Sequence, residues 1–260
     1  MNAAADFETR RFQTAAAHYL AGRAPYPPAL IARAAELVGL GPEHRLLDLG
    51  CGPAQIALAF APLVGEVMAL DPEPAMLAIA REAARDVRNV VVAKGSSDGL
   101  GPALGRFRAV TIGRAFHWMD GPETLRRLDR LVEPGGAVAL FADERPPIDE
   151  NGWVREYRDL IGAYSADDET HPRRRERTHL TTLLDSPFSR LERITVYTRR
   201  PATADSLIDQ ALSLSSTSRA RLGDRADEMI AEIRRRHANW AAAGPLTEVV
   251  GAYALIARRP

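Results

Sequence analysis

The stretch that decides the fold, residues 46–54, reads Leu-Leu-Asp-Leu-Gly-Cys-Gly-Pro-Ala, an apolar run leading into a glycine turn and the start of a helix. Glycines let the backbone approach a ligand closely, and a helix N-terminus presents free N–H groups. Asp71 follows Gly50 by 21 residues, at the end of the next apolar run. A carboxylate at that position reaches the two hydroxyls of a nucleoside ribose. The stretch therefore predicts a binding site for a cofactor that contains a nucleoside.

Short apolar runs alternate with helical patterns around this stretch. The runs are Arg45–Leu49, Val67–Leu70, Val90–Ala93, Ala109–Ile112 and Ala137–Phe141. The helical patterns lie near residues 54–63, 74–85 and 122–132, with a weaker one near 97–104, and Pro134–Gly136 predicts a turn before the fifth run. This alternation is typical of βαβ units and of a parallel sheet covered on both faces. We assign residues 41–145 to an α/β core that binds the cofactor.

The flanks of the core predict further helices and two further strands. Residues 1–40 form an N-terminal helical segment, with helices expected over Phe12–Tyr19 and Pro27–Leu40. Residues 146–260 are expected to complete the sheet with strands over Leu191–Tyr197 and Val249–Ala257, and to carry helices over Ala204–Leu214 and Arg225–Trp240. These two helices form an insertion, about residues 203–244, between the last two strands. We therefore expect a sheet that ends in a hairpin and is capped by helices.

The composition narrows the class of protein. The 260 residues contain 34 Lys and Arg and 34 Asp and Glu, so no global positive charge attracts nucleic acid. Cys51 is the single cysteine and the histidines lack metal-ligand spacing, so we expect neither a disulfide nor a metal site. No apolar stretch approaches the ~18 residues of a membrane span, and the N-terminus lacks the apolar core of a signal peptide. We expect a cytoplasmic protein without a membrane partner, and the replacement of Lys by Arg everywhere but Lys94 points to a bacterial source.

Two classes of cofactor fit a ribose-binding acid, a dinucleotide and S-adenosylmethionine. The dinucleotide fingerprint requires a third small residue where this chain has Gln55, because helix and strand pack closely there. Asp48, two residues before the first glycine, suits a ligand with a cationic amino acid part better than a pyrophosphate. The pattern therefore favours S-adenosylmethionine.

The order of the motifs resembles that of class I S-adenosylmethionine-dependent methyltransferases. The similar segments are LLDLGCGPA, VMALDPEPAML, VVVAKGSSDGL, AVTIGRAFHWMD and LVEPGGAVALF, and the upstream YLAGRAPYPPALI resembles a segment found before the core in many of these proteins. The fourth segment is similar to the bacterial small-molecule, type 11-like group, and the resemblance spans about residues 18–142. It implies a doubly wound, mostly parallel, seven-stranded Rossmann-like sheet and S-adenosylmethionine as the cofactor, with S-adenosylhomocysteine as its product.

The resemblance also implies contacts with the cofactor. The residues that would line its methionine and ribose parts are Gly50, Cys51 and Gly52. Asp48 would support this turn, Asp71 would bind the ribose hydroxyls and Pro72 would pack on the adenine. Ser96 and Ser97 stand where the family often has Asp-Ala, so a serine oxygen replaces the carboxylate expected at the adenine amino group.

Further implied contacts concern the methionine part of the cofactor. Gly113 and Arg114 end the fourth strand and would face it. Tyr19 and Arg23 would reach the cofactor from the N-terminal segment, with Arg23 as the partner of its carboxylate.

Five residues are candidates for acting on the methyl acceptor. His117 follows the fourth strand, at the edge where open α/β sheets bind ligands, and is the candidate general base. Trp118, Asp143, Glu144 and Trp153 are candidates for binding the acceptor. For each of these residues the alternative is a structural role. His117 and Trp118 would pack at the mouth of the site, and Asp143 and Glu144 would be solvated loop charges. Trp153 would form part of a helix core with Tyr157 and Tyr164.

We expect methyl transfer to a small-molecule acceptor, with bacterial secondary metabolism as the setting and with oxygen, nitrogen and carbon acceptors all open. The chain is expected to act as a monomer or homodimer and without nucleic acid. Two alternatives remain at this point. The acceptor is a nucleic acid or protein, or the chain binds S-adenosylmethionine without catalysis. The basic run Arg173–Arg177 is interpreted as charged surface, because no aromatic residues interleave it.

Overall fold

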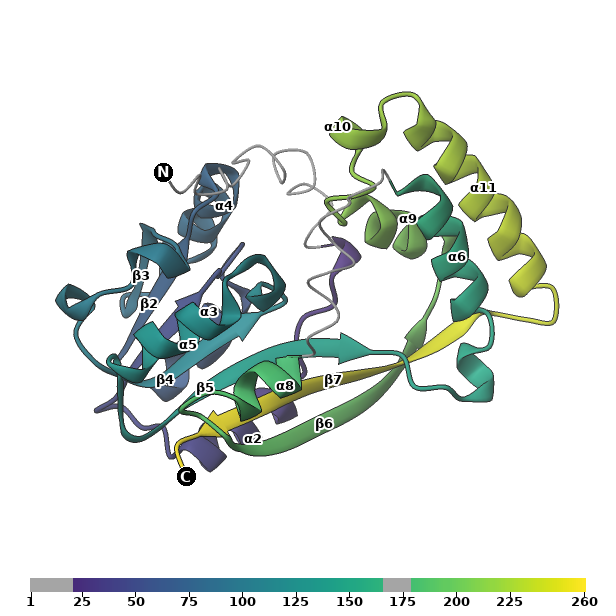
Figure 1. Ribbon diagram of the computed structural model, residues 1–260. Helices are drawn as coiled ribbons and strands as arrows, with labels where there is room; N and C mark the ends of the chain where they lie inside the picture. The colour runs from purple at the N-terminus through teal and green to yellow at the C-terminus, as the bar shows by residue number, and fades with distance from the viewer. Residues whose placement is uncertain (1–20, 166–178) are drawn as a thin grey trace.

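A computed structural model describes residues 21–165 and 179–260, and it contains one seven-stranded sheet (Figure 1). The strand order is β3-β2-β1-β4-β5-β7-β6. The strands are β1 Arg45–Leu49, β2 Glu66–Asp71, β3 Val90–Lys94, β4 Phe107–Gly113, β5 Val132–Glu144, β6 Arg190–Pro201 and β7 Thr247–Arg258. Strands β1 to β5 are parallel to one another, and β7 is antiparallel to both β5 and β6. This confirms the predicted α/β sheet and its closing hairpin.

Helices cover both faces of the sheet. The helices over one face are α2 Pro28–Val38, α3 Gln55–Phe60 and α4 Pro74–Ala83, and those over the other are α5 Gly121–Asp129 and α8 His179–Leu184. Strand β1 is buried on both faces, because Leu46 packs into one core and Leu47 and Leu49 into the other. A strand that is buried on both faces consists of consecutive apolar residues, and for this reason it could be predicted from the sequence.

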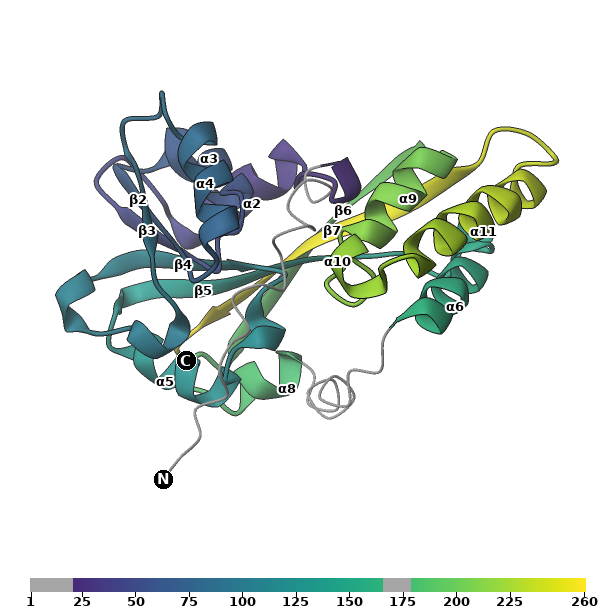
Figure 2. The same cartoon turned by 90° about the horizontal axis from the view of Figure 1, so that it is seen from above.

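The last three strands of the sheet are long. Strands β5, β6 and β7 have 13, 12 and 12 residues, whereas β1 and β3 have 5 each. Past the level of Leu140 in β5, residues 247–254 of β7 and 194–201 of β6 continue for about 26 Å at a rise of ~3.3 Å per residue. Figures 1 and 2 show that this extension carries a separate group of helices.

This helical cap consists of α6 Val154–Tyr164, α9 Ala204–Leu212, α10 Arg219–Leu222 and α11 Arg225–Trp240. The cap has its own apolar core, which is formed by buried residues of all four helices. Helix α11 buries Ala226, Met229 and Ile233 against α6 and α9. The helical spacing that predicted α6 and α11 is confirmed.

Three details differ from the predictions. The weak helix near 97–104 is replaced by two short 3₁₀ turns, η2 Ser97–Gly99 and η3 Pro102–Leu104, which leave too little length for a helix. Strand β5 begins at Val132, before the expected turn, and its pairing with β4 shifts register there while Gly135 adopts a φ of 72°. Helix α8 was not predicted, and the expected helix over Phe12–Tyr19 lies outside the described residues.

The loop between β5 and α6 is fastened to β7 by one buried side chain. Asn151 donates from Nδ2 to the carbonyl oxygens of Pro146 and Val249, both at 2.9 Å, and its Oδ1 accepts the N–H of Val249 at 2.9 Å.

No helix of the described residues is long and apolar enough to span a membrane.

We expect Asn151→Ala to lower the free energy of unfolding by about 2 kcal/mol, because it removes the partner of the buried backbone N–H and carbonyl of Val249. Urea denaturation measures this effect. The matched control is Asn239→Ala, because Asn239 is exposed on α11, and it should change stability by less than about 0.5 kcal/mol. Equal effects of the two substitutions would contradict the assignment.

Candidate active site

A cavity of about 880 Å³ lies between the carboxyl ends of the parallel strands and the cap. One half is bounded by the ends of β1, β2, β3 and β4, and the other half by α6, the residues after α9 and the start of β7. Ligand pockets of proteins measure roughly 300–1,000 Å³, so this volume accommodates a nucleoside cofactor together with a small second ligand. We refer to the two parts as the sheet half and the cap half.

The glycine turn after β1 forms the floor of the sheet half. Gly50 and Gly52 have φ values of 69° and 54°, in the left-handed region that other residues rarely adopt. A Cβ on Gly50 would lie 2.7 Å from the Cβ of Ala115, whereas a Cβ on Gly52 would meet nothing within 4 Å. The space beside Gly52 therefore opens into the cavity, and its backbone is accessible to a ligand.

Asp71 joins the turn to the start of α4. Its Oδ2 accepts the N–H of Gly52 at 2.8 Å, and its Oδ1 accepts the N–H of Glu73 at 2.8 Å. Burial raises the pKa of Asp71, and these two N–H donors act in the opposite direction. Each oxygen keeps a second lone pair, so the carboxylate can accept two hydroxyls from the cavity, which it lines.

A second acid, Glu73, lies beside Asp71 and was not singled out in the sequence. Its side chain is buried at the N-terminus of α4, where Oε1 accepts the N–H of Ala75 at 3.4 Å and Oε2 has no partner among residues 21–165 and 179–260. Glu73 belongs to the cavity lining. The open space beside Gly52, the spare acceptor capacity of Asp71 and the unpaired oxygen of Glu73 together fit a ligand rich in hydroxyl and amine donors, as a nucleoside is.

Asp48 supports the turn from below and does not line the main cavity. Its carboxylate is 1% exposed; Oδ1 accepts from the hydroxyl of Thr111 at 2.9 Å and Oδ2 from the N–H of Ala57 at 3.1 Å. Burial raises the pKa of Asp48 from 3.8 to about 7, against the lowering effect of these two hydrogen bonds. Its position is that of a structural support and not of a ligand contact.

This pKa predicts a pH dependence of stability. Between about pH 4 and about pH 7 the folded protein keeps a proton on Asp48 that the unfolded chain has lost, so the free energy of unfolding falls as pH rises through this window. Asp48→Asn should remove that contribution to the slope. Urea denaturation at several pH values measures it, and identical slopes in variant and wild type would contradict the prediction.

Most residues predicted to bind the cofactor do line the sheet half. They are Gly50, Gly52, Asp71, Pro72, Ser96, Ser97, Gly113 and Arg114. Cys51 is buried and lines only a small adjacent pocket, and burial raises the pKa of its thiol, which disfavours a thiolate. Tyr19 lies outside the described residues.

Arg23 reaches the cavity from the N-terminal segment, which is held against the cap. Arg23 donates from Nε to the hydroxyl of Ser213 at 3.1 Å. The neighbouring Gly22 is so close to α9 that a Cβ would lie 2.3 Å from the carbonyl oxygen of Asp209. Residues far apart in the chain are thereby brought to one wall of the cavity.

His117 and Trp118 line the cavity from η4 Phe116–Trp118, the 3₁₀ turn after β4. Both side chains are half-buried, and their ring centroids lie 4.7 Å apart. Trp153 lines the cap half and donates from Nε1 to the carbonyl oxygen of Thr247 at 3.1 Å. The structure therefore brings these three predicted residues together around one space.

The two acids that were expected to follow the fifth strand are the last two residues of β5, and their side chains point to opposite faces because they are adjacent in a strand. Asp143 is not part of the cavity lining but binds Arg114, with Oδ1 2.7 Å from Nε, and Arg145. Glu144 faces β6, where it pairs with Arg193 at 2.6 Å and with the hydroxyl of Tyr197 at 3.3 Å. The structure does not bring Glu144 to the cavity, contrary to the expectation that it would contact the acceptor.

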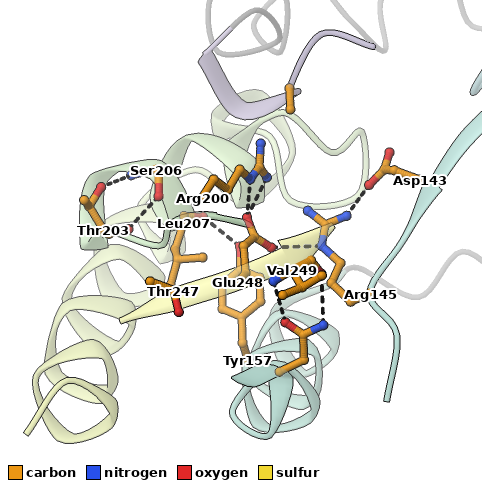
Figure 3. A network of polar contacts seen from close by, with 12 residues as sticks. Asp143, Arg145, Tyr157, Arg200, Thr203, Ser206, Leu207, Thr247, Glu248 and Val249 are labelled. Atoms are coloured by element: carbon orange, nitrogen blue, oxygen red, sulfur yellow. Dashed lines mark hydrogen bonds and ion pairs between the residues drawn. The ribbon is translucent and has the colours of Figure 1, made fainter. Parts of the chain in front are cut away.

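Asp143 begins a buried network of charges under the cap (Figure 3). Arg145 bridges Asp143 and Glu248, with Nε 3.0 Å from Oε2 of Glu248, and Arg200 binds the other oxygen of Glu248 at 2.6 Å. Burial alone raises the pKa of Asp143, but the guanidinium groups of Arg114, Arg145 and Arg23 outweigh it and hold the pKa at about 2. Asp143 is therefore ionised near neutral pH, and the network connects the sheet to the cap.

Several residues of the cap half were missed in the sequence. They are Arg145, Arg158, Ser213, Ser215, Ser216 and Glu248. In a chain with 33 arginines and a single lysine, one more arginine carries no signal of its own. The one available clue was spacing, because Val154, Tyr157, Arg158 and Ile161 fall on the same face of a helix.

Comparisons with known proteins agree with this geometry. A family described as "Methyltransferase domain" matches residues 46–136. An uncharacterized methyltransferase of Mycobacterium tuberculosis is 30% identical over 205 residues, which cover 78% of this chain and 76% of the relative. The solved structure of a proposed type II methyltransferase from Anaeromyxobacter dehalogenans is similar with a TM-score of 0.62 and 25% identity, over 91% of this chain and 97% of that one. The fold is also similar to a methyltransferase of Geobacter sulfurreducens solved with S-adenosylhomocysteine, with a TM-score of 0.56 and 16% identity, over 96% and 98% of the two chains.

Proposed function

Because this chain belongs to the class I S-adenosylmethionine-dependent methyltransferases, we propose that it transfers a methyl group to a small molecule bound in the cap half of the cavity. The observation that carries the proposal is the continuity of the cavity. One space joins Gly52 and Asp71 at the strand ends to Trp153 and Tyr157 of the cap. A nucleoside cofactor in the sheet half therefore faces whatever occupies the cap half.

The sheet half supplies the contacts for the cofactor. Asp71 and the backbone of Gly52 would hold the ribose, Pro72 and Ser97 would flank the adenine, and Arg23 would take the carboxylate. When bound, S-adenosylmethionine supplies an activated methyl group on a positively charged sulfur. The task left to the protein is to align the acceptor and to exclude water from the site.

His117 is the proposed general base for an acceptor whose reacting atom carries a proton. It lines the cavity from η4, the 3₁₀ turn after β4. A neutral imidazole at this point removes the proton of a hydroxyl or amine as the bond to carbon forms. His117 then carries the proton until solvent removes it.

A small acceptor is favoured over nucleic acid or protein by the way the cavity is covered. Helices α6 and α9 cover the cap half, and their lining side chains include the aromatic rings of Trp153 and Tyr157. The most basic run, Arg173–Arg177, lies outside the described residues, so the structure adds nothing to its interpretation. A macromolecular acceptor would predict RNA or peptide binding that weakens as salt increases.

Calorimetry with S-adenosylhomocysteine, NAD and NADP tests the cofactor assignment. We expect binding of S-adenosylhomocysteine alone. Incubation with methyl-labelled S-adenosylmethionine and, in parallel, a small-molecule extract and the RNA and protein of the producing cells tests transfer, with the label expected in a compound of low mass. Label in RNA or protein only would overturn the small-molecule proposal.

A further inference from the structure

We propose that the methyl acceptor is an organic anion whose negatively charged group is bound by Arg145 and Arg158 in the cap half of the cavity. The inference rests on the proposed function, because it names the chemical class of the acceptor for the same site. Three features carry it. They are the charge balance of the buried network, the position of Arg158 and the hydroxyl groups opposite.

The buried network contains more guanidinium groups than carboxylates. Along the chain of contacts Arg114–Asp143–Arg145–Glu248–Arg200, three positive charges alternate with two negative ones. The side chains of Arg114 and Arg145 are 13% and 12% exposed, so water screens them poorly. Within the described residues, this network has an excess of one positive charge at the cavity wall.

Arg145 retains donors for a ligand. Its Nε and Nη1 are used by Glu248 and Asp143, and no described residue accepts a hydrogen bond from its Nη2. Arg145 is also part of the cavity lining. A guanidinium group that two acids hold in place is preorganised to bind a third one, because its orientation costs no further entropy.

Arg158 adds a second cation on the facing helix. The cavity-lining residues of α6 are Val154, Tyr157, Arg158, Ile161, Gly162 and Ser165, which form one face of the helix. Arg158 lies in the middle of this otherwise uncharged face. It makes no hydrogen bond or ion pair with any residue in the described part of the chain, whereas Glu156 on the same helix pairs with Arg236 across the cap.

The remaining polar groups of the cap half are mostly donors. The segment after α9 lines it with Ser215 and Ser216, whose hydroxyls donate as readily as they accept, whereas the hydroxyl of Ser213 already donates to the carbonyl oxygen of Gln210 at 2.7 Å. Glu248 is the one carboxylate among the described lining residues of this half, and two arginines already occupy it. A cationic acceptor would meet only like charges here, whereas a carboxylate or phosphate group matches the fork geometry of the guanidinium groups.

The test begins by separating the small-molecule extract into anionic, neutral and cationic fractions before the reaction. Each fraction is incubated with methyl-labelled S-adenosylmethionine and the enzyme, and we expect label from the anionic fraction. Prior treatment of that fraction with a phosphatase distinguishes the two sources of charge. A phosphate ester loses acceptor activity, and a carboxylate keeps it.

Arg158→Gln and the matched control Arg155→Gln then locate the contact. Arg155 is on the same helix, exposed and equally without a described partner, but it does not line the cavity. With the anionic fraction, Arg158→Gln should raise KM about tenfold through loss of charge-assisted hydrogen bonds, with kcat within about threefold. Arg155→Gln should leave both within about twofold.

Binding of S-adenosylhomocysteine separates this inference from the proposed function. Calorimetry should give Arg158→Gln an affinity within about threefold of wild type. A large loss would assign Arg158 to the carboxylate of the cofactor and would overturn the inference, as would label from the neutral or cationic fraction alone. Intact binding of S-adenosylhomocysteine without label from any fraction would overturn the proposed transfer to a small molecule.

Discussion

Replacement of Asp71 by alanine should weaken the binding of S-adenosylhomocysteine by about 10²-fold. The carboxylate accepts the N–H groups of Gly52 and Glu73, each at 2.8 Å, so it holds the turn and the start of α4 together. Its remaining lone pairs would accept the ribose hydroxyls in charge-assisted hydrogen bonds, each contributing roughly 1.5–3 kcal/mol. Loss of both roles acts on the same ligand, and calorimetry measures the result.

Two further substitutions help to interpret the affinity measured for Asp71→Ala. Asp71→Asn retains one carbonyl oxygen without the charge, and we expect it to bind S-adenosylhomocysteine with an affinity between those of wild type and Asp71→Ala. Asp86→Ala is the control, because Asp86 is exposed beyond the end of α4 and pairs with Arg85 at 3.5 Å. An unchanged affinity in a folded Asp71→Ala protein would show that a different acid binds the ribose. The neighbouring Glu73 would then be the candidate.

Replacement of His117 by alanine should lower kcat by about 10²-fold while the affinity for S-adenosylhomocysteine stays within about threefold. His117 follows β4 on the turn η4 and lines the cavity. A positioned general base typically contributes 10²–10⁴-fold, whereas loss of a packing contact acts mainly on binding and stability. Single-turnover kinetics with the identified acceptor, combined with calorimetry, separate these effects.

Chemical rescue distinguishes a lost base from a damaged wall of the cavity. Added imidazole should restore part of the turnover of His117→Ala, because a small base enters the space that the side chain leaves. The control is His44→Ala; the ring of His44 accepts the N–H of Gly41 at 3.0 Å, before the start of β1 and away from the cavity. If His117→Ala leaves turnover unchanged, His117 only packs against the cavity. This result is expected for an acceptor whose reacting oxygen is already ionised, because no base is then needed.

The sheet half of the site was predictable from sequence because its determinants are local. A buried parallel strand is a continuous apolar run, a backbone with φ near 60° favours glycine, and the acid follows at the end of the next strand. Residues 46–54 and Asp71 therefore predicted the fold and the part of the cavity that we propose as the cofactor site. The resemblance to methyltransferases added the contacts of Pro72, Ser97 and Gly113, which the structure brings to the same cavity.

The cap half was decided by tertiary structure alone. Arg145, Arg158 and Glu248 come from the end of β5, the middle of α6 and the start of β7, and no sequence pattern relates their positions. Strand register determined that Asp143 binds Arg114 while Glu144 turns to β6, and a shift of one residue would have exchanged them. The sequence by itself determined which strand ends and which glycine turn form the proposed cofactor site, because short-range backbone geometry favours particular residues there. Only the packing of the cap on the long strands decided which charges face the acceptor, because that arrangement depends on contacts between segments far apart in the chain.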